Sequence, residues 1–221
     1  MATLFVTGVG TDIGKTYVCA ALIRALRGQG LAVDAFKPVI SGYDDARPHE
    51  SDAGVLLAAL GRPVTAQTVE AISPFRYAAP LSPPLAAQRE GRSIPFAAVA
   101  GACRERIADA GRQLLLIEGA GGVMSPLSDG ATVLDLIEAL ATPVLLVTGT
   151  YLGAISHTLT AVEVLRRRGH AIRAVVVNES LEPGATLEET RESLRVLAGG
   201  VPVVALARGD EDMDDLLRWI G

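Results

Sequence analysis

Short apolar runs alternate along this chain with longer segments in which apolar residues recur every three or four positions. The short runs predict strands, and the longer periodic segments predict amphipathic helices. The predicted strands are residues 4–6, 33–36, 114–117, 144–147, 172–177 and 201–206. The predicted helices are residues 15–27, 51–60, 94–110, 133–140, 155–168, 187–197 and 212–220. Residues 72–84 are rich in Pro, Ser and Ala, which predicts a loop.

This alternation of strands and helices is typical of an α/β fold with a mostly parallel central sheet and helices on both faces. The run at 114–117 is continuously apolar, as expected of a central parallel strand. We find no internal repeat and no domain boundary, so we expect residues 1–221 to form a single domain. Ligands of such sheets bind beyond the carboxyl ends of the strands, which should bring residues 8–16, 37–41, 118–122, 148–156 and 178–179 to one rim.

Composition and charge narrow the range of functions. Hydrophobic residues make up 49% and charged residues 20% of the chain, which is typical of a globular protein. The net charge is −5 and the longest basic run is three arginines at 166–168, so nucleic acid and membranes are poor candidate partners. Those arginines sit where they complement the dipole of a predicted helix. The first residues lack the pattern of a signal peptide, and Cys19 and Cys103 have no metal-ligand spacing. We therefore expect a cytoplasmic protein with two buried thiols.

Lysine is rare in this chain. Lys15 and Lys37 are the only two lysines among 20 basic residues, and the other 18 are arginines. A bias against lysine codons explains most of this imbalance. The two remaining lysines still mark positions where a compact ammonium group differs usefully from a planar guanidinium.

Residues 7–16 follow the first predicted strand and lead into the first predicted helix, the context that a phosphate-binding loop requires. Backbone N–H groups and the helix N-terminus would hold phosphate, Lys15 would reach the outer phosphates, and the Thr16 hydroxyl would bind Mg²⁺. The spacing departs from the usual motif, because five residues rather than four separate Gly8 from Gly14. The alternative is a glycine-rich turn with no ligand.

Three charged residues follow other predicted elements at the same rim. Lys37 ends a strand, and either a solvated surface lysine or an ammonium that stabilises a transferring phosphoryl group fits that position. Glu118 follows the strand at 114–117, where nucleotide-hydrolysing folds place an acidic metal ligand. Asp52 stands in the first turn of a helix, where compensation of the helix dipole is the default explanation.

Together these segments resemble the dethiobiotin synthetase family, a group of P-loop NTPase-like enzymes. The resemblance spans residues 7–178 and is most specific in Lys-Pro-Val-Ile-Ser-Gly at 37–42 and Glu-Gly-Ala-Gly-Gly at 118–122. It implies ATP- and Mg²⁺-dependent conversion of 7,8-diaminononanoate and CO₂ to dethiobiotin. A carbamate and a carbamic-phosphoric anhydride are the implied intermediates, and ADP and phosphate are released.

The resemblance also implies a role for each matching residue. It implies Lys37, Lys15 and Thr11 as catalytic residues, and Thr16, Asp52 and Glu118 as ligands of Mg²⁺. The implied nucleotide-binding residues are Asp12, Ile13, Gly14, Lys15, Thr16, Tyr17, Asp52, Glu118, Gly119, Ala120, Gly121, Asn178 and Glu179. The implied substrate-binding residues are Ser41, Ser82, Pro83, Leu152, Gly153 and Ser156. The last three would serve the partner chain of a homodimer, near the carboxylate of its substrate.

Three positions depart from the pattern of this family. Ser156 replaces the usual Asn, Glu179 replaces the commoner Asp, and Pro84 stands where some members have His. Residues 207–209 are a weak candidate for the far wall of the base site, and we expect His157 to be structural.

Two rival readings fit the sequence less well. One is an ATPase switch of the partition or septum-positioning type, which typically carries a second lysine where this chain has Gly10. The other is an amide-forming synthase of the cobyrinate type, which would need an additional glutaminase domain.

Overall fold

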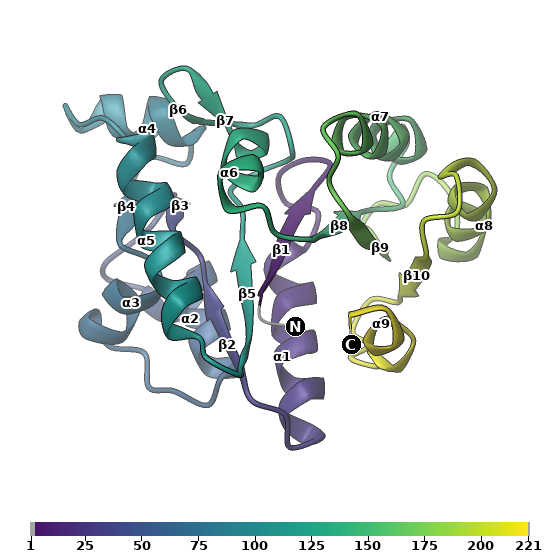
Figure 1. Ribbon diagram of the computed structural model, residues 1–221, viewed down its shortest axis with the longest axis horizontal. Coiled ribbons are helices and arrows are strands. Elements are labelled where there is room, and N and C mark those ends of the chain that lie inside the picture. Colours follow the sequence, from purple (N-terminus) through teal and green to yellow (C-terminus); the bar gives the residue numbers. More distant parts are fainter. Residues whose placement is uncertain (1–2, 221) are drawn as a thin grey trace.

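The computed structural model describes residues 3–220 and is built around a six-stranded, fully parallel sheet (Figure 1). The strand order is β10-β9-β8-β1-β5-β2, so β1 lies in the interior of the sheet between β8 and β5. The strands are β1 (Thr3–Gly8), β2 (Val33–Phe36), β5 (Leu114–Glu118), β8 (Val144–Thr148), β9 (Ile172–Asn178) and β10 (Val203–Leu206). The α/β prediction is confirmed, and the main sheet is wholly rather than mostly parallel.

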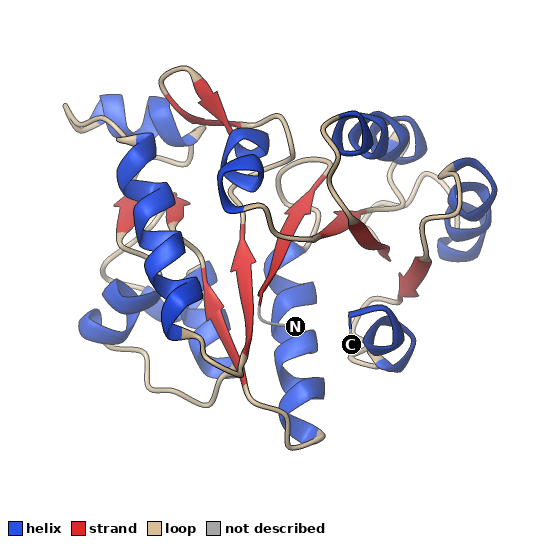
Figure 2. Ribbon diagram, in the orientation of Figure 1, coloured by secondary structure: helices blue, strands red, loops and turns tan. Residues whose placement is uncertain are grey.

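Helices flank the sheet on both faces (Figure 2). They are α1 (Lys15–Gly28), α2 (Asp52–Ala59), α3 (Ala66–Ile72), α4 (Pro83–Arg89), α5 (Phe96–Asp109), α6 (Val133–Leu140), α7 (Ala154–Arg167), α8 (Leu187–Leu197) and α9 (Asp214–Ile220). A 3₁₀ turn, η1, spans Pro48–Glu50. Within residues 3–220, no helix is both long and apolar enough to cross a membrane.

Alternating side chains of the strands supply two separate cores. In β1, Leu4 and Val6 pack with α1, α2, α3 and α9, whereas Phe5 packs on the other face with α4 to α8. In β5, Leu116 joins the first core and Ile117 the second. Because successive side chains of a strand point to opposite faces, a continuous apolar run is buried on both sides. Both cysteines are buried free thiols, as predicted.

The segment at 72–84 differs from its predicted loop. It contains β4 (Phe75–Tyr77), which pairs in parallel with β3 (Val39–Ser41), and α4 begins at Pro83. The prediction failed because two three-residue strands are too short to show an alternating pattern, and Pro83 at the first position of a helix looks like a breaker in sequence. The short helix α3 and the antiparallel hairpin of β6 (Pro126–Ser128) and β7 (Ala131–Thr132) were also missed.

Gly54 allows α2 to approach η1 closely. A β-carbon at Gly54 would lie 2.3 Å from the carbonyl oxygen of Pro48 and 2.7 Å from that of His49. Backbone atoms cannot move aside as a flexible side chain can, so we expect Gly54→Ala to lower the free energy of unfolding by roughly 1–3 kcal/mol. Urea denaturation followed by circular dichroism would measure the change. Gly101→Ala is the matched control, because its β-carbon would meet no atom within 4 Å; equal stability of the two variants would contradict this packing.

Candidate functional site

The loop between β1 and α1 lies at the carboxyl end of the sheet. The N–H of Val9 donates to the carbonyl of Val147 over 3.0 Å, which anchors the start of the loop to β8. Lys15 begins α1, is buried, and donates from Nζ to the carbonyl oxygen of Gly10 over 2.8 Å. Gly14 adopts a left-handed conformation with φ 86° just before the helix. Strand, loop, lysine and helix therefore have the arrangement that binds phosphate in other proteins.

The segment after β5 packs against the backbone of this loop. A β-carbon at Gly122 would lie 3.0 Å from the backbone nitrogen of Gly10 and 3.1 Å from the carbonyl oxygen of Gly8. The N–H of Gly122 donates to Ser125 Oγ over 2.7 Å, and Gly121 has φ 73°. Gly122 thus allows two backbones to lie in contact, which a larger side chain would prevent.

A buried cluster of charges lies beside the loop. Lys37 Nζ contacts Glu118 Oε1 over 2.6 Å and also forms an ion pair with Asp52 Oδ2. The Thr16 hydroxyl lies 2.9 Å from Asp52 Oδ1 and 2.7 Å from Glu118 Oε1. Lys37 is 5% exposed and Glu118 is 1% exposed, whereas the Asp52 side chain is 41% exposed. The solvated reading of Lys37 is therefore excluded, and the fold brings all four residues together from separate elements.

The charges in this cluster shift one another's pKa values. Burial alone would lower the pKa of Lys37, but the carboxylates of Glu118 and Asp52 outweigh it and raise the pKa above its usual value. Burial, and then the charge of Lys37, lower the pKa of Lys15. Burial opposes ionisation of Asp52, yet Lys37 and Thr16 hold its pKa below the ordinary range. The pairing of Asp52 hence contributes stability above the ordinary aspartate pKa, and this stability is lost as the pH falls through the lowered value.

The oxygen atoms of this cluster fit a bound Mg²⁺. Glu118 Oε2 is buried and has no hydrogen-bond partner among residues 3–220. Thr16 and the two carboxylates offer hard oxygen ligands, which Mg²⁺ prefers, and it commonly keeps several waters and phosphate oxygens as its remaining ligands. In the described part of the chain, no three His, Cys, Asp or Glu side chains gather into a metal-binding group. A site of two acids and one hydroxyl therefore suits a metal that arrives with a phosphate ligand.

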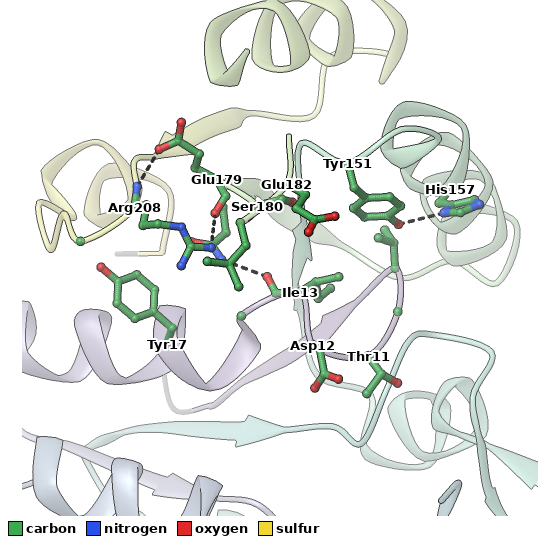
Figure 3. Close-up of a pocket in the computed structure, with 16 residues that line it drawn as sticks. Thr11, Asp12, Ile13, Tyr17, Tyr151, His157, Glu179, Ser180, Glu182 and Arg208 are labelled. Atoms are coloured by element: carbon green, nitrogen blue, oxygen red, sulfur yellow. Dashed lines mark hydrogen bonds between the residues drawn. The ribbon is translucent and has the colours of Figure 1, made fainter. Parts of the chain in front are cut away.

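A cavity of about 850 Å³ opens beside the loop (Figure 3). Its wall includes residues of the loop, Tyr17 of α1, and the segments that follow β8, β9 and β10. Figure 3 shows Tyr17 and Arg208 on one side of the cavity, with Tyr151 and His157 on the other. The lining residues are Val9, Gly10, Thr11, Asp12, Ile13, Gly14, Tyr17, Tyr151, His157, Asn178, Glu179, Ser180, Leu181, Glu182, Arg208 and Gly209.

The Tyr17 side of the cavity is held by several contacts. The Asn178 amide donates from Nδ2 to the carbonyl of Ile13 over 3.0 Å. The N–H of Arg208 donates to Glu179 Oε2 over 3.0 Å, and the Tyr17 hydroxyl donates to the carbonyl of Asp210. The weak candidate segment 207–209 therefore contributes Arg208 and Gly209 to the wall that Asn178 and Glu179 also form.

The predicted substrate residues near α4 form a separate group. Ser41 ends β3, and the N–H of the adjoining Gly42 donates to the carbonyl of Ala79 over 3.0 Å. Ser82 is the residue before α4, whose first residue is Pro83. Pairing of β3 with β4 thus brings Ser41 near the start of α4, although Ser41, Ser82 and Pro83 do not line the large cavity.

The start of α7 faces solvent. Leu152 is 90% exposed, Gly153 precedes the helix with φ 98°, and Ser156 is exposed. These three residues do not line the large cavity, but their neighbours Tyr151 and His157 do. The Tyr151 hydroxyl lies 2.8 Å from His157 Nδ1.

Sequence reasoning missed several of the lining residues. Tyr151 lies within the segment 148–156 that we expected at this rim, but Ser180, Leu181 and Glu182 follow the end of β9 and were not expected there. The rule that ligands bind beyond the carboxyl ends of strands could have found them, since the end of β9 was followed only as far as Glu179. The N–H of Thr150 donates to Ser180 Oγ over 2.9 Å, and the N–H of Ser180 donates to Thr150 Oγ1 over 3.1 Å, so these two segments are bonded to each other.

Gly14 should tolerate no side chain. Its φ of 86° disfavours any L-residue, and an added β-carbon would lie 2.2 Å from Asn178 Nδ2. We expect Gly14→Ala to raise the KM for nucleotide about tenfold or more while the protein remains folded. Steady-state kinetics and thermal melting would measure both effects. Gly28→Ala, at the other end of α1, meets no atom within 4 Å and is the matched control; an unchanged KM in Gly14→Ala would contradict the role of this residue.

Comparison with known sequences finds close relatives over nearly the whole chain. A family model described as an AAA domain matches residues 2–209. The "ATP-dependent dethiobiotin synthetase BioD" of Phenylobacterium zucineum (strain HLK1) is 51% identical over 209 residues, covering 94% of this chain and 89% of the relative. The protein of the same name from Methylobacterium nodulans (strain LMG 21967 / CNCM I-2342 / ORS 2060) is 53% identical over 214 residues, covering 95% and 94%. That of Caulobacter vibrioides (strain NA1000 / CB15N) is 49% identical over 218 residues and covers 98% of each chain.

Solved structures of similar fold are more distant in sequence. A chain of the MinC:MinD cell division protein complex of Aquifex aeolicus matches with a TM-score of 0.55 at 13% identity, covering 99% of this chain and 86% of that one. The hydrogenase maturation factor HypB of Archaeoglobus fulgidus matches with a TM-score of 0.55 at 14% identity, covering 99% and 89%. At such identities the likeness shows only a common fold.

Proposed function

Because this chain belongs to the ATP-dependent dethiobiotin synthetase family, we propose that it uses ATP to convert 7,8-diaminononanoate and CO₂ to dethiobiotin. The observation that carries the assignment to particular residues is the buried cluster of Lys37, Asp52, Glu118 and Thr16 beside the phosphate loop. In the proposed reaction, this second buried ammonium group offsets the negative charge of the transferring phosphoryl group.

The chemistry proceeds in three steps. One amine of the substrate adds to CO₂ and loses a proton, which gives a carbamate. A carbamate oxygen then attacks the γ-phosphorus of ATP, and ADP leaves with the electrons of the broken P–O bond. The second amine attacks the carbonyl carbon of the resulting anhydride, expels phosphate, and closes the ureido ring. The second step joins two anions, so the site must reduce their repulsion and hold them in line.

The residues of the site have distinct tasks in this scheme. Lys15 and the N–H groups of residues 11–16 hold the phosphates, and Lys37 stabilises negative charge on the transferring group. When bound, Mg²⁺ would be held by Thr16, Asp52 and Glu118 and would neutralise charge on the phosphates. Asn178, Glu179 and Tyr17 would border the base, while Ser41, Ser82 and Pro83 would bind the diamine.

Further parts of the proposal concern assembly. We propose a homodimer in which Leu152, Gly153 and Ser156 bind the substrate carboxylate of the partner chain, supported by the exposure of these residues at a helix N-terminus. We also propose that residues 1–221 form one synthetase domain, because the strands of the main sheet come from the whole range between Thr3 and Leu206. We propose a cytoplasmic location for the protein. Light scattering during turnover tests the dimer, because a fully active monomer would contradict a shared site.

The reaction itself is tested by supplying 7,8-diaminononanoate, bicarbonate and Mg-ATP and measuring ADP and dethiobiotin together. We expect both products, and neither when the diamine is omitted. Release of ADP that ignores the diamine would contradict the proposal and favour an ATPase switch.

A further inference from the structure

The ammonium group of Lys37 lies among the same oxygens that would bind Mg²⁺. It contacts Glu118 Oε1 over 2.6 Å and is paired with Asp52 Oδ2. The Thr16 hydroxyl adjoins Asp52 Oδ1 and Glu118 Oε1, so three of the four carboxylate oxygens are already engaged. The fourth, Glu118 Oε2, is buried and without a partner among residues 3–220.

A metal ion bound to these carboxylates would lie within a few ångströms of the Lys37 ammonium. Both are cations, and like charges held a few ångströms apart in a buried site repel strongly. Lys15 adds another buried cation nearby, which donates to the carbonyl of Gly10. Each positive charge that enters the cluster therefore makes the next one less favourable unless phosphate arrives with it.

The backbone of Lys37 is held by hydrogen bonds, while its side chain has rotatable bonds of its own. Its N–H donates to the carbonyl of Ile72 over 2.9 Å, and the carbonyl of the next residue, Pro38, accepts from the N–H of Phe75 over 3.0 Å. Between this anchored backbone and the ammonium lie four methylene groups with rotatable bonds. A change in the position of the charge thus requires no movement of the strands.

We propose that Lys37 and the divalent cation compete for Asp52 and Glu118, so that Lys37 has two positions during the reaction cycle. Without nucleotide, its ammonium neutralises the two carboxylates and keeps metal affinity low. The cation delivered with the nucleotide displaces the ammonium from the carboxylates, and the freed group becomes available to the negative charge of the reacting phosphate and carbamate. Binding of the cation would thereby move the Lys37 ammonium from the carboxylates toward the reacting groups.

This inference rests on the proposed function only for the identity of the metal ligands. Its test is a binding measurement on nucleotide-free protein, with no diamine present, so it can fail while dethiobiotin is still formed. Mn²⁺ serves as the probe, because its binding is followed directly by electron paramagnetic resonance.

We expect Lys37→Met to bind Mn²⁺ at least about tenfold more tightly than the wild type without nucleotide, because the competing charge is gone. Lys37→Arg, which keeps the charge, should bind Mn²⁺ as weakly as the wild type. The double variant Lys37→Met with Glu118→Gln should lose the gain, which assigns it to these carboxylates. Lys37→Gln provides a second uncharged variant if Lys37→Met is unstable. Mn²⁺ affinity in a folded, uncharged variant that is equal to or weaker than that of the wild type would overturn the proposal.

Discussion

Replacing Lys37 by Arg is expected to lower kcat by on the order of 10²-fold while the KM for ATP changes by less than about threefold. The charge is kept, so a purely electrostatic requirement would be met. The site is buried and already contacts Glu118 over 2.6 Å, and a planar guanidinium is bulkier than an ammonium. Steady-state kinetics of dethiobiotin formation, with nucleotide affinity measured separately, would separate the two effects.

The matched control for this exchange lies on α8. Arg191 pairs with Glu188 on the surface, so Arg191→Lys should leave kcat unchanged. Arginine is the usual basic residue of this chain, and comparing the two variants tests whether position 37 specifically requires lysine. Normal turnover in Lys37→Arg would remove the compact ammonium from the mechanism.

Glu118→Gln is expected to have the second large effect. The side chain is 1% exposed, contacts Lys37, and is bonded to the Thr16 hydroxyl. The amide keeps the shape but loses the charge, which leaves Lys37 with Asp52 as its remaining partner. Breaking a buried ion pair lowers the free energy of unfolding by roughly 3–5 kcal/mol. Because Lys37 keeps Asp52 as a partner, we expect Glu118→Gln to lose an amount near the lower end of that range. We expect kcat to fall about 10³-fold, because the proposed metal site and Lys37 lose the same carboxylate.

Asp52→Asn is the comparison for this variant. The Asp52 side chain is 41% exposed, so solvent compensates part of its lost charge, and its effect on stability should be smaller. Chemical denaturation and the Mg²⁺ dependence of turnover would rank the two variants. A larger loss of stability in Asp52→Asn would contradict the order of burial on which the expectation rests.

Much of the fold could be predicted from local patterns. The central strands β5 and β8 are nearly continuous apolar runs, β2 and β9 are apolar apart from polar residues such as Asp34 and Arg173, and most long helices have an apolar face. Local sequence therefore predicts which segments are buried. The pair of β3 and β4 could not be predicted in this way. Each has three residues, and their pairing depends on contacts across more than thirty positions of sequence, as between Val39 and Phe75.

Site residues could be predicted where they belong to a sequence motif of known chemical role. Lys15 and Thr16 follow from the phosphate loop. The local pattern explains Asp52 only as an acid that compensates the helix dipole, and the family resemblance alone implied a metal ligand; the fold places it against Lys37. Nothing in sequence spacing shows that Lys37, Asp52 and Glu118 form one cluster, because the sheet order brings them together. Leu181 was missed for the same reason, since its position depends on how β8 and β9 end side by side.

The most direct test of the central claim follows one oxygen atom. If a carbamate oxygen attacks the γ-phosphorus and is later expelled with phosphate, then oxygen from CO₂ must appear in the released phosphate. With ¹⁸O-labelled bicarbonate, unlabelled water and a reaction short enough to limit exchange, we expect one ¹⁸O atom per phosphate by mass spectrometry, in amounts that match dethiobiotin. Phosphate without excess ¹⁸O, formed alongside ADP, would show that water attacks ATP and would contradict the account.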